Sequence, residues 1–357
     1  MLEKFFQKKK EPLVGVDIRS TSVKVLQLEK IENQITVVGY GVELLPPNTV
    51  VEKNIKDVDS LGGSIKKAME RAKLTTKNAA IAVAGTAVIT QVIQVDKNLT
   101  QAETEDQIFL EADRYIPYSL DEVNLDFEVL GPARNKNPDL LDVILAAAKH
   151  EVVDLRIAAV NAAGLKAKIV DVESLAMERA LSLLAHQLPK EQIKDNIALI
   201  DIGATTTTLH IFNDLRSIYT REQAFGGKQL LEEIQRRYGL SVEEASSVNI
   251  YDGLPDDFAP EVLQPFKESV VQQVNRALQF FFSSGEHQDI SYIILSGGVS
   301  TLIGLDELIQ KKIGKKTFVA NPFADMVISK NINANALLHD APGLMVCCGL
   351  ALRTFDS

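Results

Sequence analysis

The sequence predicts an α/β fold of two related halves, and three observations support this prediction. The stretch Ile197–Phe212 contains an apolar run, an aspartate, a glycine and four threonines before its apolar residues resume. Leu13–Leu28 repeats that order, with an aspartate before a turn rich in hydroxyl groups. Around these stretches, segments with strand periodicity alternate with segments at helical spacing. We therefore expect a duplicated fold that holds a phosphate between its copies, because the spacing is too long for a solenoid repeat.

The C-terminal copy is interpreted as a β-hairpin whose tight turn faces an anion. Gly203 permits the bend, and the hydroxyl and N–H groups of Thr205, Thr206 and Thr207 can surround a phosphate. Asp201 repels a phosphate directly but can hold it through a hydrated Mg²⁺. Taken alone, this stretch is explained equally well as an ordinary hairpin with a threonine-rich turn.

The N-terminal copy decides between these two interpretations. Asp17 ends an apolar strand, and Ser20, Thr21 and Ser22 supply the hydroxyl-rich turn. Two such hairpins in one chain favour a site in which a phosphate is held between the two turns, over an ordinary hairpin with a threonine-rich turn. Asp17 and Asp201 are therefore the candidate metal ligands, acting through water on Mg²⁺.

Composition excludes several classes of protein. The 357 residues can form two substantial cores, and 46% hydrophobic with 24% charged residues describe a soluble globular protein. A formal net charge of −10 argues against nucleic acid as a partner. Charges within Met1–Lys10 argue against a signal peptide, and no run reaches the roughly 18 apolar residues of a membrane span. The adjacent Cys347 and Cys348 are expected in the core of a cytosolic protein, and the five histidines show no zinc-binding pattern.

In the first half, three strands and a helix precede an inserted β/α block. A third strand over Ile35–Glu43 follows the first hairpin, and Val58–Lys73 has apolar residues at helical spacing. The following strands and one helix with a capping box are predicted over residues 79–84, 87–95, 100–115, 123–130 and 141–147. A helix, a strand and a helix then complete this half, over His150–Ala163, Lys166–Val172 and Glu173–Leu188.

In the second half, a strand near Ser217–Gln223 extends the hairpin, and residues 226–228 (GGK) open a helix whose N–H groups a ligand can approach. Helices over 242–248, 259–284 and 305–313 and a strand over 290–295 are predicted next. The chain ends in an apolar helix, Pro342–Leu352. Gly343 and Gly349 in this helix predict close packing against another helix.

Five segments in a fixed order resemble the five motifs of the actin/Hsp70/sugar-kinase superfamily. They match the phosphate 1, connect 1, phosphate 2, adenosine and connect 2 motifs, as DIRSTSVK at Asp17, DVESLA at Asp171, DIGATTT at Asp201, LSGGVSTLIGL at Leu295 and PGLMVCCGLA at Pro342. Each motif is weak alone, but five in order across nearly the whole chain are a strong match. The resemblance implies an actin-like ATPase fold of two duplicated domains, with an FtsA-type β/α subdomain inserted in the first.

Three further segments narrow the resemblance to the PilM family of type IV pilus assembly: PPNTVVEKNI at Pro46, VAGTAVIT at Val83 and YIPYSLDEVNLDFEVLG at Tyr115. The resemblance implies ATP or ADP with Mg²⁺ in the interdomain cleft. It also implies binding of the cytoplasmic N-terminal peptide of the membrane protein PilN, along the first domain beside the inserted subdomain. Other platform proteins, the pilus motor ATPases and further copies of the chain are the other candidate partners. Because Arg353–Ser357 adds no amphipathic helix, a cytoplasmic protein held at the inner membrane through partners is expected.

The resemblance also assigns residues to the nucleotide site. They are Asp17, Ser20, Thr21, Ser22 and Lys24 of phosphate 1, Asp201, Gly203, Thr205, Thr206 and Thr207 of phosphate 2, Gly226, Gly227 and Lys228 at a helix start, and Gly297 and Gly298 of the adenosine motif. The alternative for Lys24 is a strand lysine that faces solvent.

Arg19 departs from the superfamily, which has glycine there. A Cβ would be costly if this turn needs a positive φ, and the guanidinium could pair with phosphate or face solvent.

The same resemblance gives the predicted domain ranges. They are 1–45 and 149–190 for the first actin-like domain, 46–148 for the inserted subdomain, 191–325 for the second domain with a helical subdomain at 226–286, and 326–357 for a return to the first domain.

The residues leave open whether the chain is an enzyme. Glu173 is the candidate base for an attacking water, and the alternative is an acid that complements the dipole at a helix N-terminus. We expect ATP binding with at most slow hydrolysis. The leading functional prediction is a nucleotide-binding component of the pilus inner-membrane platform that supports pilus assembly and twitching motility. A filament-forming protein like FtsA and a small-molecule kinase of the same superfamily are the alternatives.

Overall fold

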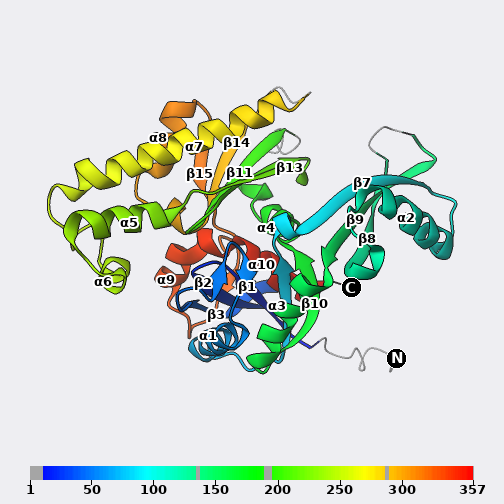
Figure 1. Ribbon diagram of the computed structural model, residues 1–357, viewed down its shortest axis with the longest axis horizontal. Helices are drawn as coiled ribbons and strands as arrows, with labels where there is room; N and C mark the ends of the chain where they lie inside the picture. The colour runs from blue at the N-terminus through cyan, green and yellow to red at the C-terminus, as the bar shows by residue number, and fades with distance from the viewer. Residues whose placement is uncertain (1–10, 134–136, 189–194, 286–288, 357) are drawn as a thin grey trace.

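The computed structural model describes residues 11–133, 137–188, 195–285 and 289–356 and shows a mixed α/β protein built around two sheets (Figure 1). The first sheet has the strand order β10 (Lys166–Val172), β6 (Asn78–Val83), β1 (Leu13–Ile18), β2 (Ser22–Ile31), β3 (Gln34–Leu44) and β16 (Val327–Ile328). The second sheet has the order β13 (Arg216–Gln223), β12 (Thr207–Asn213), β11 (Asn196–Ile202), β14 (Tyr292–Ser296) and β15 (Lys316–Val319).

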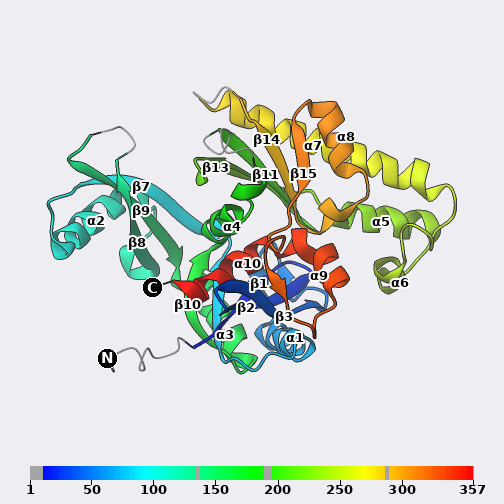
Figure 2. The same ribbon diagram turned by 180° about the vertical axis from the view of Figure 1, so that it is seen from behind.

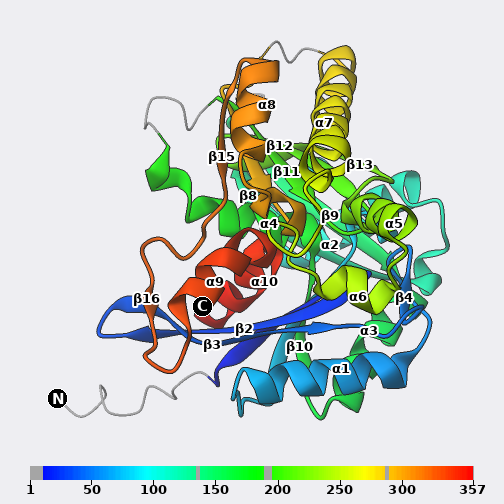
Figure 3. The ribbon, with the colours of Figure 1, turned by 90° about the vertical axis from the view of Figure 1, so that its left-hand side faces the viewer.

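Helices separate and cover the two sheets in layers (Figure 3). Between the sheets lie α4 (Glu173–Ser182) and α10 (Met345–Ala351), whose apolar side chains join both sheets in one core. The outer face of the first sheet packs on α1 (Val58–Arg71) and α3 (His150–Ala162). The outer face of the second packs on α5 (Gly227–Tyr238), α7 (Gln264–Ser283) and α8 (Leu305–Ile313). The short helices α6 (Val242–Ser247) and α9 (Ala334–Asp340) and the strand pair β4 (Val50–Val51) and β5 (Asn54–Ile55) complete these two parts.

The two sheets repeat the same local topology. Strands β1 and β2 form an antiparallel hairpin, and β1 also pairs in parallel with β6. Strands β11 and β12 form the corresponding hairpin, and β11 pairs in parallel with β14. Asp17 stands opposite Lys24 in the first hairpin, and Asp201 stands opposite Thr208 in the second. The predicted duplicated α/β fold is therefore confirmed.

A third sheet projects beside the first two, on the side away from α5 and α6 (Figure 2). Its strand order is β7 (Val88–Asp96), β9 (Leu140–Lys149) and β8 (Val123–Pro132), with α2 (Gln101–Tyr115) packed on it. The predicted start of the insertion at residue 46 is wrong. Strand β6 lies between β1 and β10 in the first sheet, and α1 packs on that sheet, so residues 46–83 belong to the first sheet and its cover.

Several predicted element boundaries also differ. The helix predicted over Glu173–Leu188 ends at Ser182 and is followed by a 3₁₀ turn, Ala185–Gln187. A π-helical turn, Ala259–Leu263, leads into α7, and a 3₁₀ turn, Ala341–Leu344, leads into α10. The predicted boundary at 190–191 and the charged segment 1–10 lie outside the described residues.

The C-terminal run Ala334–Phe355 is long and apolar enough to cross a membrane by length and composition, although we expected no such run from the sequence. Of its most apolar window, 67% is buried inside the protein. Cys347 and Cys348 are fully buried there, as expected for core residues. A buried core helix passes the same test, and α10 in this run lies between the two sheets.

Two glycines let α10 fit between its neighbours. A Cβ on Gly349 would lie 1.8 Å from the carbonyl oxygen of Ala176 in α4. A Cβ on Gly15 in β1 would lie 2.5 Å from the carbonyl oxygen of Cys347. The predicted close helix packing is therefore observed for Gly349. Gly343 instead approaches the Lys24 ammonium group, 3.2 Å from the position of an added Cβ.

The Gly349→Ala substitution should lower the free energy of unfolding by about 1–3 kcal/mol, because the added methyl group overpacks the contact between α4 and α10. Urea denaturation of the full chain measures this change. Gly63→Ala on the exposed face of α1 is the matched control, since its Cβ meets nothing within 4 Å. It should raise stability by roughly 0.5–1 kcal/mol. Equal midpoints for the two variants would contradict this account of the packing.

Candidate functional site

The turns of the two equivalent hairpins have the same backbone hydrogen bond. The N–H of Arg19 donates to the carbonyl of Ser22 at 2.9 Å, and the N–H of Gly203 donates to the carbonyl of Thr206 at 2.9 Å. Arg19 therefore occupies the position of Gly203. Neither residue has a positive φ, so this turn does not require glycine, and the strain considered for Arg19 does not arise.

Arg19 joins the two predicted aspartates across the cleft. Its Nε donates to both carboxylate oxygens of Asp17, at 2.9 and 3.0 Å, and its Nη1 donates to Oδ2 of Asp201 at 3.0 Å. The remaining oxygen of Asp201 accepts from the Ser296 hydroxyl at 3.1 Å. All four carboxylate oxygens therefore have a donor. From the sequence we expected the guanidinium either to pair with phosphate or to face solvent. Neither expectation included this bridge between the two aspartates.

Arg19 and Asp201, which connect the two halves, are both held in their charged forms. Burial alone would lower the pKa of Arg19, but the charges of Asp17 and Asp201 outweigh it and raise this pKa above its ordinary value. Burial alone would raise the pKa of Asp201, but Arg19 and Lys24 outweigh it and keep this pKa below its ordinary value. The bridge therefore remains an ion pair at neutral pH.

A cavity of about 370 Å³ lies beside this bridge, between the two hairpin turns. The predicted residues that line it are Ser20, Thr21, Ser22, Lys24, Asp201, Gly203, Thr205, Thr206, Gly227, Gly297 and Gly298. The hydroxyls of Ser20 and Thr205 lie 2.8 Å apart and link the two turns directly. The ammonium group of Lys24 donates to the carbonyl of Gly343 at the cavity wall, so this lysine does not face open solvent.

Glycines shape the wall opposite the turns. Gly297 has φ +86°, and a Cβ there would lie 2.3 Å from the carbonyl oxygen of Ile202. Gly298 has open space in the direction of its missing Cβ. The absence of side chains at these positions leaves room for a ligand between the turns and the 3₁₀ turn Gly298–Thr301.

Four predicted residues do not line this cavity: Asp17, which pairs with Arg19, and three residues of the second half. The Thr207 hydroxyl donates to the carbonyl of Phe225 at 2.8 Å and is buried in the sheet. Gly226 packs on the second turn, where a Cβ would lie 2.4 Å from the carbonyl oxygen of Gly203. The side chain of Lys228 is exposed and lies 3.5 Å from Glu232 in the next helical turn.

The first N–H groups of α5 are also already occupied. The N–H of Gly227 donates to the carbonyl of Gly203 at 3.0 Å, and that of Lys228 donates to the carbonyl of Ala204 at 2.8 Å. The predicted role of these groups as ligand donors is therefore wrong. They instead hold the threonine-rich turn against the start of the helix.

The aspartate pair does not fit the predicted Mg²⁺ site. A magnesium ion or its hydration shell between Asp17 and Asp201 would have to displace the Arg19 guanidinium and would lie beside its positive charge. Throughout the described parts of the chain, no group of three or more His, Cys, Asp or Glu side chains could hold a metal ion.

Glu173 lies at the N-terminus of α4, outside the 370 Å³ cavity. Its carboxylate is 3.4 Å from the ammonium group of Lys53, which also contacts the carboxylate of Glu222 in β13. Burial alone would raise the pKa of Glu173, but Arg19 and Lys53 outweigh it and lower this pKa. The carboxylate at the start of α4 therefore lies among cations in its charged form, and its role as a base for water stays a prediction.

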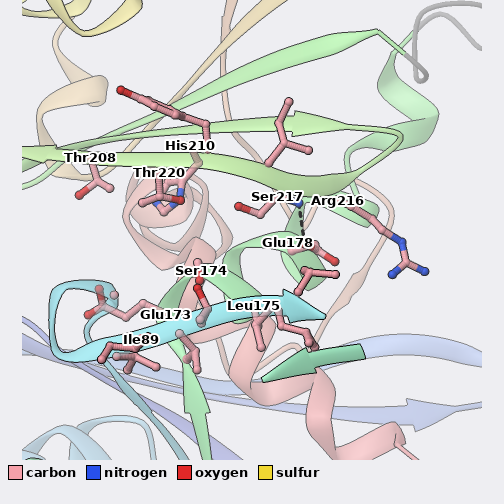
Figure 4. A pocket seen from close by; sticks show the side chains of 18 of the residues that line it. Ile89, Glu173, Ser174, Leu175, Glu178, Thr208, His210, Arg216, Ser217 and Thr220 are labelled. Atoms are coloured by element: carbon pink, nitrogen blue, oxygen red, sulfur yellow. Dashed lines mark hydrogen bonds between the residues drawn. The ribbon is translucent and has the colours of Figure 1, made fainter. Parts of the chain in front are cut away.

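A second cavity of about 550 Å³ lies between the inserted sheet, α4 and β13 (Figure 4). Its walls include β7 and β13, which are the edge strands of their sheets. The N–H of Ser217 donates to Glu178 at 2.8 Å, and the Arg216 guanidinium donates to the carbonyl of Leu130 in β8 at 3.0 Å. Burial lowers the pKa of His210 at this cavity to about 4, so its ring is neutral at pH 7.

Lys53 lines both cavities, although no sequence motif identifies it as a site residue. It sits in the two-residue turn between β4 and β5, where Glu52 and Lys53 both have positive φ. These residue types do not signal such a turn, which is usually built from glycine and asparagine. Only the fold brings Lys53 to Glu173 and Glu222.

Comparison with known proteins gives consistent matches. The family model for the type IV pilus assembly protein PilM matches residues 15–355. Cell division protein FtsA of Bacillus subtilis (strain 168) is 22% identical over 87% of this chain and 79% of its own length. FtsA of Enterococcus hirae is 24% identical over 86% of this chain and 78% of its own length.

Solved structures match the chain as well. A PilM–PilN type IV pilus biogenesis complex has a TM-score of 0.80 and 27% identity, covering 98% of this chain and 100% of that chain. The ethanolamine utilization protein EutJ from Carboxydothermus hydrogenoformans has a TM-score of 0.53 at 15% identity, covering 96% of this chain and 89% of its own, and shares the fold. With a family model that matches nearly all of its length, the chain belongs to the PilM family of type IV pilus assembly proteins.

Proposed function

We propose that the chain is a nucleotide-binding component of the type IV pilus inner-membrane platform, working at the cytoplasmic face of that membrane. ATP or ADP would occupy the 370 Å³ cavity between the two hairpin turns. The observation that carries this proposal is the meeting of both turns, with their hydroxyls, at one glycine-lined cavity between the two sheets.

The lining residues divide by chemistry into a phosphate end and a nucleoside end. Hydroxyl groups and two cations, Arg19 and Lys24, gather at the turns, which suits phosphate oxygens. Gly297 and Gly298 leave space at the other end, which suits the bulk of a nucleoside. A bound nucleotide would supply negative charge that contacts both halves at once and so sets how they sit against each other.

The partner we propose is the N-terminal cytoplasmic peptide of PilN, in the 550 Å³ cavity beside the inserted sheet. A related chain of known structure is part of a PilM–PilN complex. An extended peptide can pair with the free edge of a sheet, and β7 and β13 both offer such an edge to this cavity. Apolar side chains such as Ile89 and Leu175 supply contacts for its side chains (Figure 4).

Lys53 gives a physical route between the two proposed ligands. Its ammonium group links Glu173, next to the first sheet, with Glu222 in the second sheet, and it lines both cavities. A nucleotide that changes the position of Lys53 would change the wall of the peptide cavity. Coupling of this kind requires only that the two states differ in these contacts.

The Gly298→Leu substitution should weaken ADP binding at least about tenfold, because the new side chain fills the cavity without meeting protein atoms near its Cβ. Isothermal titration calorimetry measures the affinity. Gly63→Leu, at an exposed helix position with open space, is the control and should bind ADP like the wild type. A folded Gly298→Leu protein with wild-type affinity would exclude this cavity as the nucleotide site.

The Leu175→Glu substitution should weaken binding of a labelled synthetic PilN N-terminal peptide at least about tenfold, because it puts a carboxylate among apolar contacts. Fluorescence anisotropy with and without ADP measures both the affinity and its coupling to nucleotide. Leu110→Glu on α2, where the native side chain is 74% exposed, is the matched control. If the two variants bind the peptide equally well, the peptide lies elsewhere.

The Glu173→Gln substitution should leave any ATP turnover within about twofold of the wild type, because Glu173 anchors Lys53 and does not line the nucleotide cavity. Phosphate release under saturating ATP gives the rate, and ADP affinity gives a check on the fold of the site. A loss of roughly a hundredfold in turnover with unchanged affinity would instead identify Glu173 as the base.

A further inference from the structure

The two hairpin turns are equivalent in backbone but not in charge. Arg19 and Gly203 make the same turn hydrogen bond, and neither has a positive φ. The turn therefore accepts either a glycine or a side chain at this position. What differs is that the Arg19 side chain crosses the cleft and reaches the aspartate that precedes Gly203.

Two buried carboxylates that share one partner need that partner to be a cation, because like charges in a poorly solvated site are costly. Asp17 is 2% exposed and Asp201 is 7% exposed. Arg19 supplies this cation from the chain itself. Its three N–H···O contacts and the hydroxyl of Ser296 give each of the four carboxylate oxygens a donor.

The guanidinium still has donors to offer. Nε and Nη1 are used by the aspartates, whereas Nη2 has no hydrogen-bond partner among the residues that the structure describes. Arg19 lines the cavity beside the hydroxyl groups of both turns. A guanidinium has a planar fork of donors that matches phosphate oxygens.

We propose that Arg19 takes the place of the divalent cation in this cleft, so that the chain binds its nucleotide without Mg²⁺. This inference rests on the proposed nucleotide site. Arg19 neutralises the two aspartates and presents its remaining donors to the phosphates, while Lys24 and the turn hydroxyls complete the phosphate end. Binding a hydrated Mg²⁺ between the aspartates would require breaking the contacts that Arg19 makes.

The test is to titrate ADP into the full chain by calorimetry, once in magnesium chloride and once in EDTA. For the wild type, the two dissociation constants should agree within about threefold. Arg19→Gly gives the first turn the glycine that the second has and frees both aspartates. Its ADP affinity should be at least about tenfold higher in magnesium chloride than in EDTA. Arg114→Ala on α2, where the native side chain is 70% exposed, should behave like the wild type.

A second measurement follows the metal directly. Electron paramagnetic resonance of Mn²⁺ mixed with nucleotide-free protein should show free Mn²⁺ with the wild type and bound Mn²⁺ with Arg19→Gly. If Arg19→Gly does not fold, the two wild-type titrations still decide the question.

The outcomes are distinct. Wild-type affinity that falls tenfold or more in EDTA overturns the inference but leaves the nucleotide site in place. Equal affinities of folded Arg19→Gly in the two buffers overturn the role of Arg19. No binding of ADP or ATP by the wild type in either buffer overturns the proposed function itself.

Discussion

The structure depends on one electrostatic constraint, which is that each hairpin delivers an aspartate to the same buried place. Asp17 and Asp201 lie one residue before the ends of the first strands of the two hairpins, so a duplicated fold that closes on itself brings them together. Their charges would push the halves apart without a cation. Arg19 provides that cation and, with the Ser20–Thr205 hydroxyl pair, turns the repulsion into a contact between the halves.

The packing beneath this contact keeps the turns in register. Helix α10 fits between β1 and α4 only because Gly15 and Gly349 carry no side chain. The carbonyl of Pro342, just before α10, accepts hydrogen bonds from Ser296 and from the N–H of Gly297. The helix packing therefore fixes the wall opposite the turns, and the size of the cleft follows from the core between the two sheets.

Within the proposed function, the charges in and around the cleft fit nucleotide binding better than fast hydrolysis. Each carboxylate oxygen of the two aspartates already has a donor from Arg19 or Ser296, and the Glu173 carboxylate lies 3.4 Å from the Lys53 ammonium group. Hydrolysis needs a free group to orient the attacking water. Lys53 instead ties the start of α4 to the edge strand β13, at the point where the two cavities meet. Within the proposed function, binding of a nucleotide would thus change the wall of the neighbouring 550 Å³ cavity.

The sequence by itself determined the α/β class, the duplication and most elements, because apolar periodicity and turn residues act over a few residues. The family motifs likewise predicted most of the cavity lining, including Ser20, Thr205 and Gly298.

Only the tertiary structure decided which groups remain free for a ligand. The hydroxyl of Thr207 and the first N–H groups of α5 are used internally, and the insertion begins after β6 because β6 pairs within the first sheet. The roles of Arg19 and Lys53 depend on partners distant in the chain, Asp201 for Arg19 and Glu173 and Glu222 for Lys53. Local pattern carries no information about such contacts, since they form only when the two halves close.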